Sequence, residues 1–241
     1  MKIILGLRQN MAVIFTLVNQ LVGRVVTIQL LVAMCLACPA LALAQTIKLI
    51  DQFGQPVTNA VVAIAQEQKP HIVPTDIAVM DQMNKQFVPQ VLVIQQGQQV
   101  SFPNSDDIRH HVYSFSAPKP FEIKLFKGAV TEPVTFEQPG IVVLGCNIHD
   151  KMLGYIYVAQ NETSYLSNEQ GMVELPENTT EITLWQANLS AQNSQRKTIN
   201  LTTLKPLPNS DVLTISLTLL HAPMPSETES KSTSKFKKKF N

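Results

Sequence analysis

Short apolar runs separated by turn-forming residues fill the chain from residue 77 to residue 159. In Val100–Phe102 and Val112–Ser116, apolar residues alternate with small or polar ones, and this period of two places successive side chains on opposite faces of a β-strand. No stretch of the segment has the period of an amphipathic helix. The runs are Ile77–Met80, Val91–Ile94, Val100–Phe102, Val112–Ser116, Phe121–Phe126, Val130–Phe136, Ile141–Leu144 and Tyr155–Val158. Many short strands at regular spacing predict an all-β sandwich or barrel.

Further β-like runs lie on both sides of this segment. Ile47–Ile50 and Ala60–Ala65 precede it and flank a turn signal at Gly54-Gln55-Pro56. Thr163–Pro176 follows it and has the pattern of a strand, a tight turn and a strand. Glu181–Gln186, Thr198–Leu201 and Val212–Leu220 are further expected strands. These runs predict a second small β unit beside the first.

Cys146, His149 and Met152 follow one of the runs at intervals of three residues. They offer a thiolate, an imidazole and a thioether, a soft half of a metal site. A second histidine would complete a trigonal His/His/Cys set with a weak axial methionine, the ligand set of electron-transfer copper centres. Structural zinc is disfavoured because such sites use four cysteine or histidine ligands. A cysteine-nucleophile enzyme is disfavoured because its base normally comes from a distant position and needs an orienting group.

The N-terminus has the pattern of a secretory signal peptide. The first 44 residues contain no acidic residue, and their only charges are Lys2, Arg8 and Arg24. The apolar run Val25–Ala37 precedes an Ala-Leu-Ala ending, which predicts cleavage after Ala44. We therefore expect a periplasmic protein whose leader, residues 1–44, is removed. An uncleaved leader that anchors the protein in a membrane is the alternative, and the shortness of the apolar run disfavours it.

Removal of the leader changes the charge and the cysteine content. The full chain has 19 basic and 18 acidic residues, and loss of the three basic residues of the leader leaves 16 against 18, a net charge of −2. A nucleic-acid partner is not expected for such a chain. Cys35 and Cys38 leave with the leader, so Cys146 has no internal disulfide partner. It is then a free thiol, an intermolecular bridge or a metal ligand, and the adjacent His149 and Met152 favour the metal ligand.

Segment 77–159 resembles the cupredoxins, the blue copper proteins of the plastocyanin and amicyanin group. The motifs that carry the resemblance are Phe87-Val88-Pro89, Val100-Ser101-Phe102-Pro103-Asn104, His110-His111-Val112, Glu137-Gln138-Pro139-Gly140 and Cys146-x-x-His149-x-x-Met152. The spacing of the last motif is similar to the short ligand loop of amicyanin. More distantly, the whole chain resembles periplasmic proteins often labelled methylamine utilization proteins. The resemblance implies a Greek-key β-sandwich, one type 1 copper ion and an electron carrier that is not an enzyme.

The resemblance also implies His110 as the fourth metal ligand, beside Cys146, His149 and Met152. Strand alternation allows only one of His110 and His111 to point inward and leaves open which one does. The register with Val112 favours His110. In many relatives an asparagine follows this ligand and hydrogen-bonds to the ligand loop, and here His111 takes its place. That departure puts the rigidity of the loop in question.

Residues around the expected site have predicted roles as well. Phe102, Phe115 and Val143 are expected to keep water away from the metal. His149 is expected near the surface, with Met152 and Leu153 forming an apolar rim where a redox partner docks. His71, which has no other ligand type near it, is expected to be a solvated loop histidine.

The start and the end of the chain together resemble one small β-sandwich of the carboxypeptidase-regulatory or transthyretin-like kind. The opening motif Asp51-x-x-Gly54-x-Pro56-Val57 is typical of that module, whereas the C-terminal part lacks an opening. We hypothesise that the module is split around the cupredoxin unit; a simple tandem of two sandwiches is the alternative. The predicted parts are a leader (1–44), first module strands (45–66), a linker (67–76), the cupredoxin unit (77–159), the rest of the module (160–221) and a disordered basic tail (222–241).

The expected function is single-electron transfer between redox proteins, such as a cytochrome or a periplasmic dehydrogenase. The basic run Lys235–Lys239 of the tail is expected to be solvated, and contact with an anionic membrane or an acidic partner is the alternative. Two other functions stay open. The same ligands suit a copper-delivery protein without redox turnover, and a structural sandwich with a vestigial site is the third reading.

Overall fold

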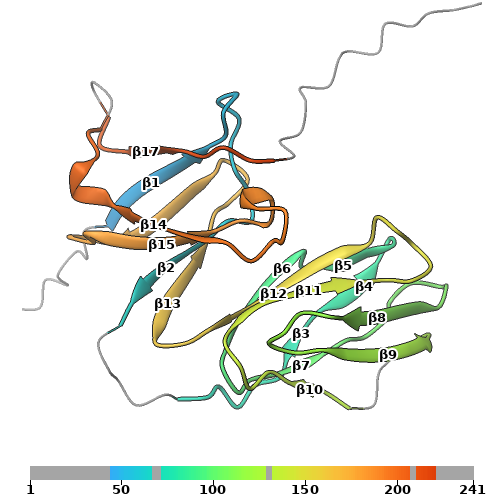
Figure 1. The fold of residues 1–241 in the computed structure, drawn as a ribbon. Helices are drawn as coiled ribbons and strands as arrows, with labels where there is room; N and C mark the ends of the chain where they lie inside the picture. Colours follow the sequence, from blue (N-terminus) through green and yellow to red (C-terminus); the bar gives the residue numbers. More distant parts are fainter. Residues whose placement is uncertain (1–43, 67–71, 129–131, 207–209, 221–241) are drawn as a thin grey trace, which may run out of the picture. The chain divides into compact units, whose positions relative to one another are not determined.

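The computed structural model describes residues 44–66, 72–128, 132–206 and 210–220. These residues form β-strands joined by turns and loops (Figure 1). Two short 3-10 turns, η1 (Ala187–Leu189) and η2 (Leu201–Thr203), are the only helical elements among these residues. The all-β prediction is therefore confirmed. The described residues include no helix with the length and apolar character needed to cross a membrane.

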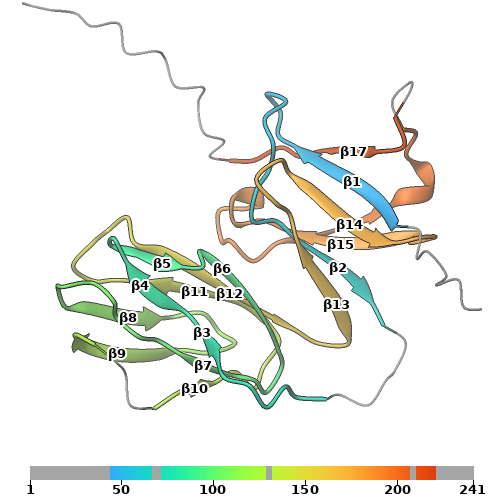
Figure 2. The same ribbon diagram turned by 180° about the vertical axis from the view of Figure 1, so that it is seen from behind.

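Residues 78–159 form three sheets. Their strands are β3 (Ala78–Val79), β4 (Asp81–Met83), β5 (Gln86–Val88), β6 (Val91–Gln95), β7 (Gln99–Ser101), β8 (His110–Ser114), β9 (Phe121–Phe126), β10 (Val134–Thr135), β11 (Gly140–Gly145) and β12 (Leu153–Ala159). The largest sheet has the order β6-β12-β11-β8-β9, a second has the order β10-β7-β3, and β4 and β5 form a hairpin (Figure 2). Buried side chains from all three sheets meet in one apolar cluster, which is the core of this sandwich.

The central strands of the five-stranded sheet are buried on both faces, which explains why β12 shows a nearly continuous buried pattern. Its side chains still alternate. Ile156 and Val158 join the core between the sheets, whereas Tyr155 and Tyr157 lie in a separate apolar cluster with Trp185. All these residues of β12 are buried, and the period-two alternation determines which of the two apolar clusters each one belongs to.

The remaining strands form a second pair of sheets. They are β1 (Ala44–Ile50), β2 (Val61–Ala65), β13 (Glu162–Leu166), β14 (Met172–Pro176), β15 (Glu181–Trp185), β16 (Arg196–Asn200) and β17 (Leu213–Ser216). β1 lies between β14 and β17, and β2 lies between β13 and β15 (Figure 1). Buried residues of both sheets, including Leu49, Val62, Leu175 and Leu184, form one core.

The two N-terminal strands are therefore inner strands of sheets whose other members come from the far end of the sequence. Val62 pairs with Tyr165 on one side and with Leu184 on the other. Ile47 pairs with Val173 and Leu213 in the same way. Strands from the two ends of the chain therefore pair with each other, which is the arrangement that the split-module hypothesis expects. The residue boundaries proposed for the parts stay predictions.

Several other predictions lie outside the described residues. They are the leader up to residue 43, His71, and the basic tail from residue 222. The hairpin of β4 and β5 lies within the described part and was missed, because its runs are short and polar. Asn84 and Lys85 form its turn with positive φ values of 55° and 60°.

Candidate metal centre

Cys146 continues the inward face of β11. Val142 and Leu144 of this strand point into the core between the sheets, and Cys146 follows them at the same spacing of two. It is 4% exposed and carries a free thiol. The strand therefore delivers one soft sulfur ligand into an apolar, water-poor environment, at the end where the loop to β12 begins.

β8 delivers the first histidine from the neighbouring strand. His110, Val112 and Ser114 are buried, whereas His111 and Tyr113 are half-buried. Since Val112 belongs to the core, period-two alternation turns His110 inward and His111 to the other face. His111 Nε2 lies 3.0 Å from Glu122 Oε1 on β9. The structure thus places His110 beside Cys146 and pairs His111 with an outer carboxylate instead of the ligand loop.

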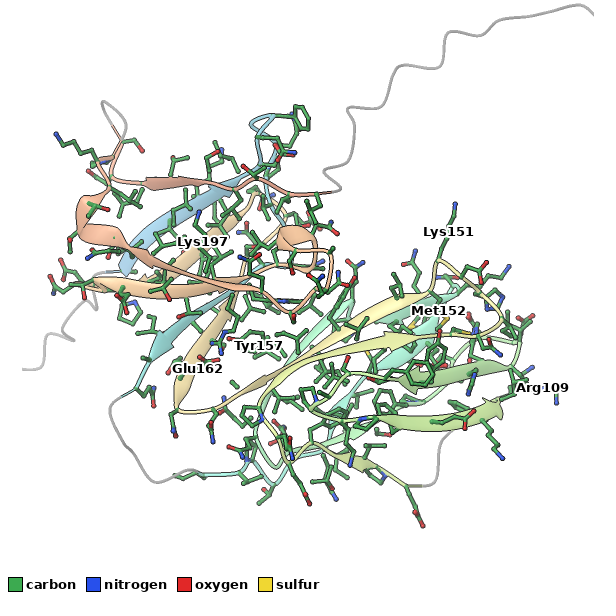
Figure 3. All side chains as sticks on the ribbon, viewed as in Figure 1. Arg109, Lys151, Met152, Tyr157, Glu162 and Lys197 are labelled. Carbon is green, nitrogen blue, oxygen red and sulfur yellow. The ribbon has the colours of Figure 1, made fainter. Side chains whose placement is uncertain are left out.

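The ligand loop consists of two consecutive turns. The N–H of His149 donates to the carbonyl of Cys146 at 3.4 Å, and the N–H of Met152 donates to the carbonyl of His149 at 2.9 Å. Each hydrogen bond joins residues that are three positions apart, so the sequence spacing of the motif is the spacing of the turns. Met152 is 1% exposed and shares the apolar cluster with Cys146. Figure 3 shows Lys151, the residue before it, extending away from the sandwich.

Three ligand atoms converge at this end of the sandwich. Cys146 Sγ lies 3.8 Å from Nδ1 of His110 and 3.8 Å from Nδ1 of His149. Ligand atoms of all three residues lie within 4.8 Å of one another, and this is the only such His/Cys/Asp/Glu group found in the described ranges. The two imidazole rings are 5.0 Å apart at their centroids, and 58° separates their planes.

These distances fit a shared metal ion. Metal–sulfur and metal–nitrogen bonds of about 2.3 and 2.0 Å that meet at about 120° separate the sulfur from the nitrogen by about 3.7 Å. The observed 3.8 Å separations therefore suit one ion held by the sulfur and both nitrogens. With three strong donors and a buried thioether, the donor set is the one that copper electron-transfer sites use.

The other nitrogen of His110 is held by Asp106, a residue that the sequence did not point to. His110 Nε2 lies 2.6 Å from Asp106 Oδ2, and the side chains are 0% and 15% exposed. Partial burial works against ionisation of Asp106. Hydrogen bonds from the Lys85 backbone, from His110 and from the Asn84 backbone outweigh this effect and hold the pKa of the carboxyl below its ordinary value.

The shell around the ligands differs from the expected one. Phe102 is fully buried in the same cluster as Cys146 and Met152. The prediction that Phe115 shields the site is wrong, because this ring is 87% exposed. The same prediction for Val143 is wrong, because this side chain packs on the other face of β11, in the cluster around Trp185. Val143 is next to the inward Leu144 on β11 and so faces the other way, whereas Phe115 lies just beyond the end of β8.

The surface next to the ligand loop is partly apolar. His149 is half-buried, and Ile148 and Leu153 are 47% and 45% exposed. Leu153 forms part of the expected rim, whereas the expectation for Met152 is wrong because it lies in the core. Ile148 takes its place at the surface. Figure 3 shows Arg109, the neighbour of His110, extending outward at the same end of the sandwich as Met152.

Comparison with known proteins yields partial structural likenesses. No protein-family model and no curated protein matches the chain. A copper-containing nitrite reductase from Thermus scotoductus is 23% identical with a TM-score of 0.34, over 46% of this chain and 28% of the other. Amicyanin from Paracoccus versutus is 20% identical with a TM-score of 0.32, over 40% of this chain and 97% of the other. A purple cupredoxin from Nitrosopumilus maritimus is 21% identical with a TM-score of 0.31, over 35% of this chain and 100% of the other.

This chain thus spans less than a third of the nitrite reductase and nearly all of the two small cupredoxins. Because the TM-scores are low, the chemistry of the site is inferred below from its own residues.

Proposed function

We propose that this protein binds one copper ion between His110, Cys146, His149 and Met152 and carries single electrons between redox partners. One observation carries the proposal: the Cys146 sulfur lies 3.8 Å from an Nδ1 of each of two histidines in a buried, apolar setting. A structural zinc site would use a fourth cysteine or histidine, and the described residues bring only three such ligands together. Copper, when bound, supplies a one-electron couple at this point.

Each ligand has a distinct role in the proposal. The Cys146 thiolate would hold the ion as its sulfur ligand and would connect the site to β11. The two imidazoles bind through Nδ1 as neutral groups, a form that suits both oxidation states of copper. Met152, which is buried in the same cluster as Cys146, would add a weak thioether ligand. Rigid strands on either side of the loop hold these positions, so that little rearrangement accompanies a change of charge.

His149 is the proposed exit for the electron. His110 is fully buried, whereas His149 is half-buried, and the exposed residues Ile148 and Leu153 lie in and at the end of the same loop. A redox partner such as a cytochrome or a periplasmic dehydrogenase would dock on this small apolar surface. The protein is proposed to act in the periplasm and to have no enzymatic activity of its own.

Addition of Cu(II) to the purified apo-protein tests the proposal. We expect uptake of one equivalent and an intense blue thiolate-to-copper band. His110→Ala should abolish the band, and so should Cys146→Ser. His111→Ala is the matched control, because it removes the neighbouring imidazole from the outer face of the same strand, and it should leave the band in place.

The outcomes separate the alternatives. Rapid bleaching with retention of Cu(I) would indicate a copper-delivery protein instead of an electron carrier. Absence of stoichiometric uptake would indicate a vestigial site in a structural sandwich. A blue band that survives Cys146→Ser would show that the ligand assignment is wrong.

A further inference from the structure

Asp106 connects a remote hairpin turn to the buried histidine. Its Oδ1 accepts a hydrogen bond from the N–H of Asn84 at 2.7 Å, and its Oδ2 accepts one from the N–H of Lys85 at 2.9 Å. Oδ2 also lies 2.6 Å from His110 Nε2. Asn84 and Lys85 are the two positive-φ residues of the β4–β5 turn, so this turn points two successive N–H groups at the carboxylate.

The loop that carries Asp106 is fixed independently of this contact. Asn104, which is 4% exposed, accepts a hydrogen bond from the N–H of Asp106 at 3.0 Å. Its side-chain amide donates to the carbonyls of Ile108 and Phe126 at 2.9 Å each. Asn104 thus fixes the backbone of Asp106, and the N–H groups of the hairpin fix its carboxylate. Together they orient the carboxylate toward His110.

We infer that Asp106 is a positioning residue of the metal centre, which holds His110 with Nε2 protonated and Nδ1 free to bind, and which favours the more highly charged oxidation state of the bound ion. The inference rests on the proposed function. An ionised carboxylate only accepts hydrogen bonds, so a separation of 2.6 Å places the proton on Nε2 of His110. A carboxylate on the distal nitrogen makes a histidine ligand more basic and fixes its ring.

The carboxylate also places a negative charge one imidazole ring away from the ion. This charge stabilises Cu(II) more than Cu(I), because the attraction grows with the charge of the ion. The β4–β5 hairpin thereby contributes to the redox properties of the site, although none of its residues is a ligand. The next residue, Asp107, is exposed. It carries the same kind of side chain as Asp106 but no hydrogen bond to His110 is found for it, so it serves as the control.

The first test uses the apo-protein and needs no variant. Nitrogen NMR of the imidazoles at about pH 8, above the ordinary histidine pKa of about 6.5, should show His110 with Nε2 protonated and Nδ1 bare. A bare Nε2 would overturn the inference even if the protein takes up copper. This measurement is independent of the proposed function, because no metal is present.

The second test compares Asp106→Asn with Asp107→Asn, which remove the same charge from adjacent positions. Loss of an outer-shell partner typically lowers metal affinity about 10- to 100-fold, and we expect this for Asp106→Asn with Cu(II). The loss should be smaller for Cu(I), so the reduction potential should rise; a tenfold difference between the two states equals about 59 mV for one electron. Asp107→Asn should change both affinities and the potential only slightly, because water and salt screen this exposed charge.

The results are distinguishable from failure of the proposed function. If the wild-type protein takes up copper and turns blue, but both variants have the same potential, then Asp106 has no positioning role. If the wild-type protein takes up no copper, the proposed function fails, while the apo-protein NMR still decides how His110 is held. Circular dichroism of each variant shows whether the β-sandwich is intact, and a purely structural role would not raise the potential of a folded variant.

Discussion

Gly154→Ala should destabilise the sandwich where β12 leaves the ligand loop. A β-carbon at this position would lie 2.8 Å from Cβ and 2.9 Å from Cγ of Phe87. Phe87 is 2% exposed and belongs to the core, and its Cβ is attached directly to the backbone of β5. Relief of the clash therefore requires a movement of β5 or β12, not a rotation of one side chain.

Gly145 provides a matched control on the partner strand, because it pairs with Leu153 next to Gly154. A β-carbon at Gly145 would also meet an aromatic ring at 2.8 Å, but the atoms are Cζ and Oη at the far end of Tyr113. Tyr113 is half-buried, so its ring can swing toward solvent. The two substitutions add the same methyl group and change the unfolded chain in the same way, and their difference isolates the contact with Phe87.

The expected magnitudes follow from overpacking. An extra methyl group in a packed core typically lowers the free energy of unfolding by about 1–3 kcal/mol, against a gain of about 0.4–1 kcal/mol when alanine replaces glycine in the unfolded chain. Gly145→Ala should be close to neutral. Gly154→Ala should be clearly destabilising, and each kcal/mol should lower the Tm by about 2–4 °C for a protein of this size.

Urea denaturation of the apo-proteins, followed by circular dichroism, measures both changes without any effect of metal binding. The ligand loop should respond too, because Gly154 is two residues from Met152, and the copper form of Gly154→Ala should show an altered visible spectrum. Equal stabilities of the two variants would refute the reasoning. The contact with Phe87 at Gly154 would then be relieved as easily as the contact with the Tyr113 ring at Gly145.

Three further predictions concern other contacts. Ser167→Ala should lower the free energy of unfolding in urea by about 1–3 kcal/mol, because the Ser167 hydroxyl accepts a hydrogen bond from the buried N–H of Ala60 at 2.9 Å. Ser164→Ala is the control and should leave this free energy unchanged, because the buried Ser164 hydroxyl has no hydrogen-bond partner among the described residues. The pKa of Asp106 lies below its ordinary value of 3.8 in the folded protein. The ionised carboxylate therefore stabilises the apo-protein above pH 3.8, and this stabilisation is lost as the pH falls through the pKa of the folded state. The free energies of unfolding of wild type and Asp106→Asn, measured in an acid titration, should approach each other in that pH range. Met152→Gln should keep the blue band and shift the reduction potential in voltammetry, because only the axial donor changes; loss of the band would contradict an axial role.

Local patterns in the sequence anticipated most of the strands. Phe121–Phe126 was predicted with the bounds that β9 has, and β11 and β12 extend the predicted runs by one or two residues at each end. Such strands are readable because each is a short apolar run between turn signals. β4 and β5 were missed, since Asp81–Met83 and Gln86–Val88 each contain one buried side chain and derive their pairing from a turn.

Buried strands also limited the predictions at the level of single residues. On β8 the alternation is visible because one face is more exposed, and the inward register of His110 with Val112 follows from it. β11 is buried on both faces, so the sequence offers no contrast by which to assign Val143 to one cluster or the other. Phe115 lies just beyond the end of β8, where the strand pattern no longer applies, and there its ring is exposed.

The sequence by itself determined the spacing of Cys146, His149 and Met152, because that spacing equals two successive turns and needs no distant partner. Only the tertiary structure decided which histidine meets the sulfur at 3.8 Å, that a turn at Asn84 and Lys85 holds Asp106 against His110, and that β1 and β2 lie inside sheets formed by the end of the chain. The physical reason is that turns and strand alternation are local, whereas strand pairing and contacts between loops depend on residues far apart in the chain.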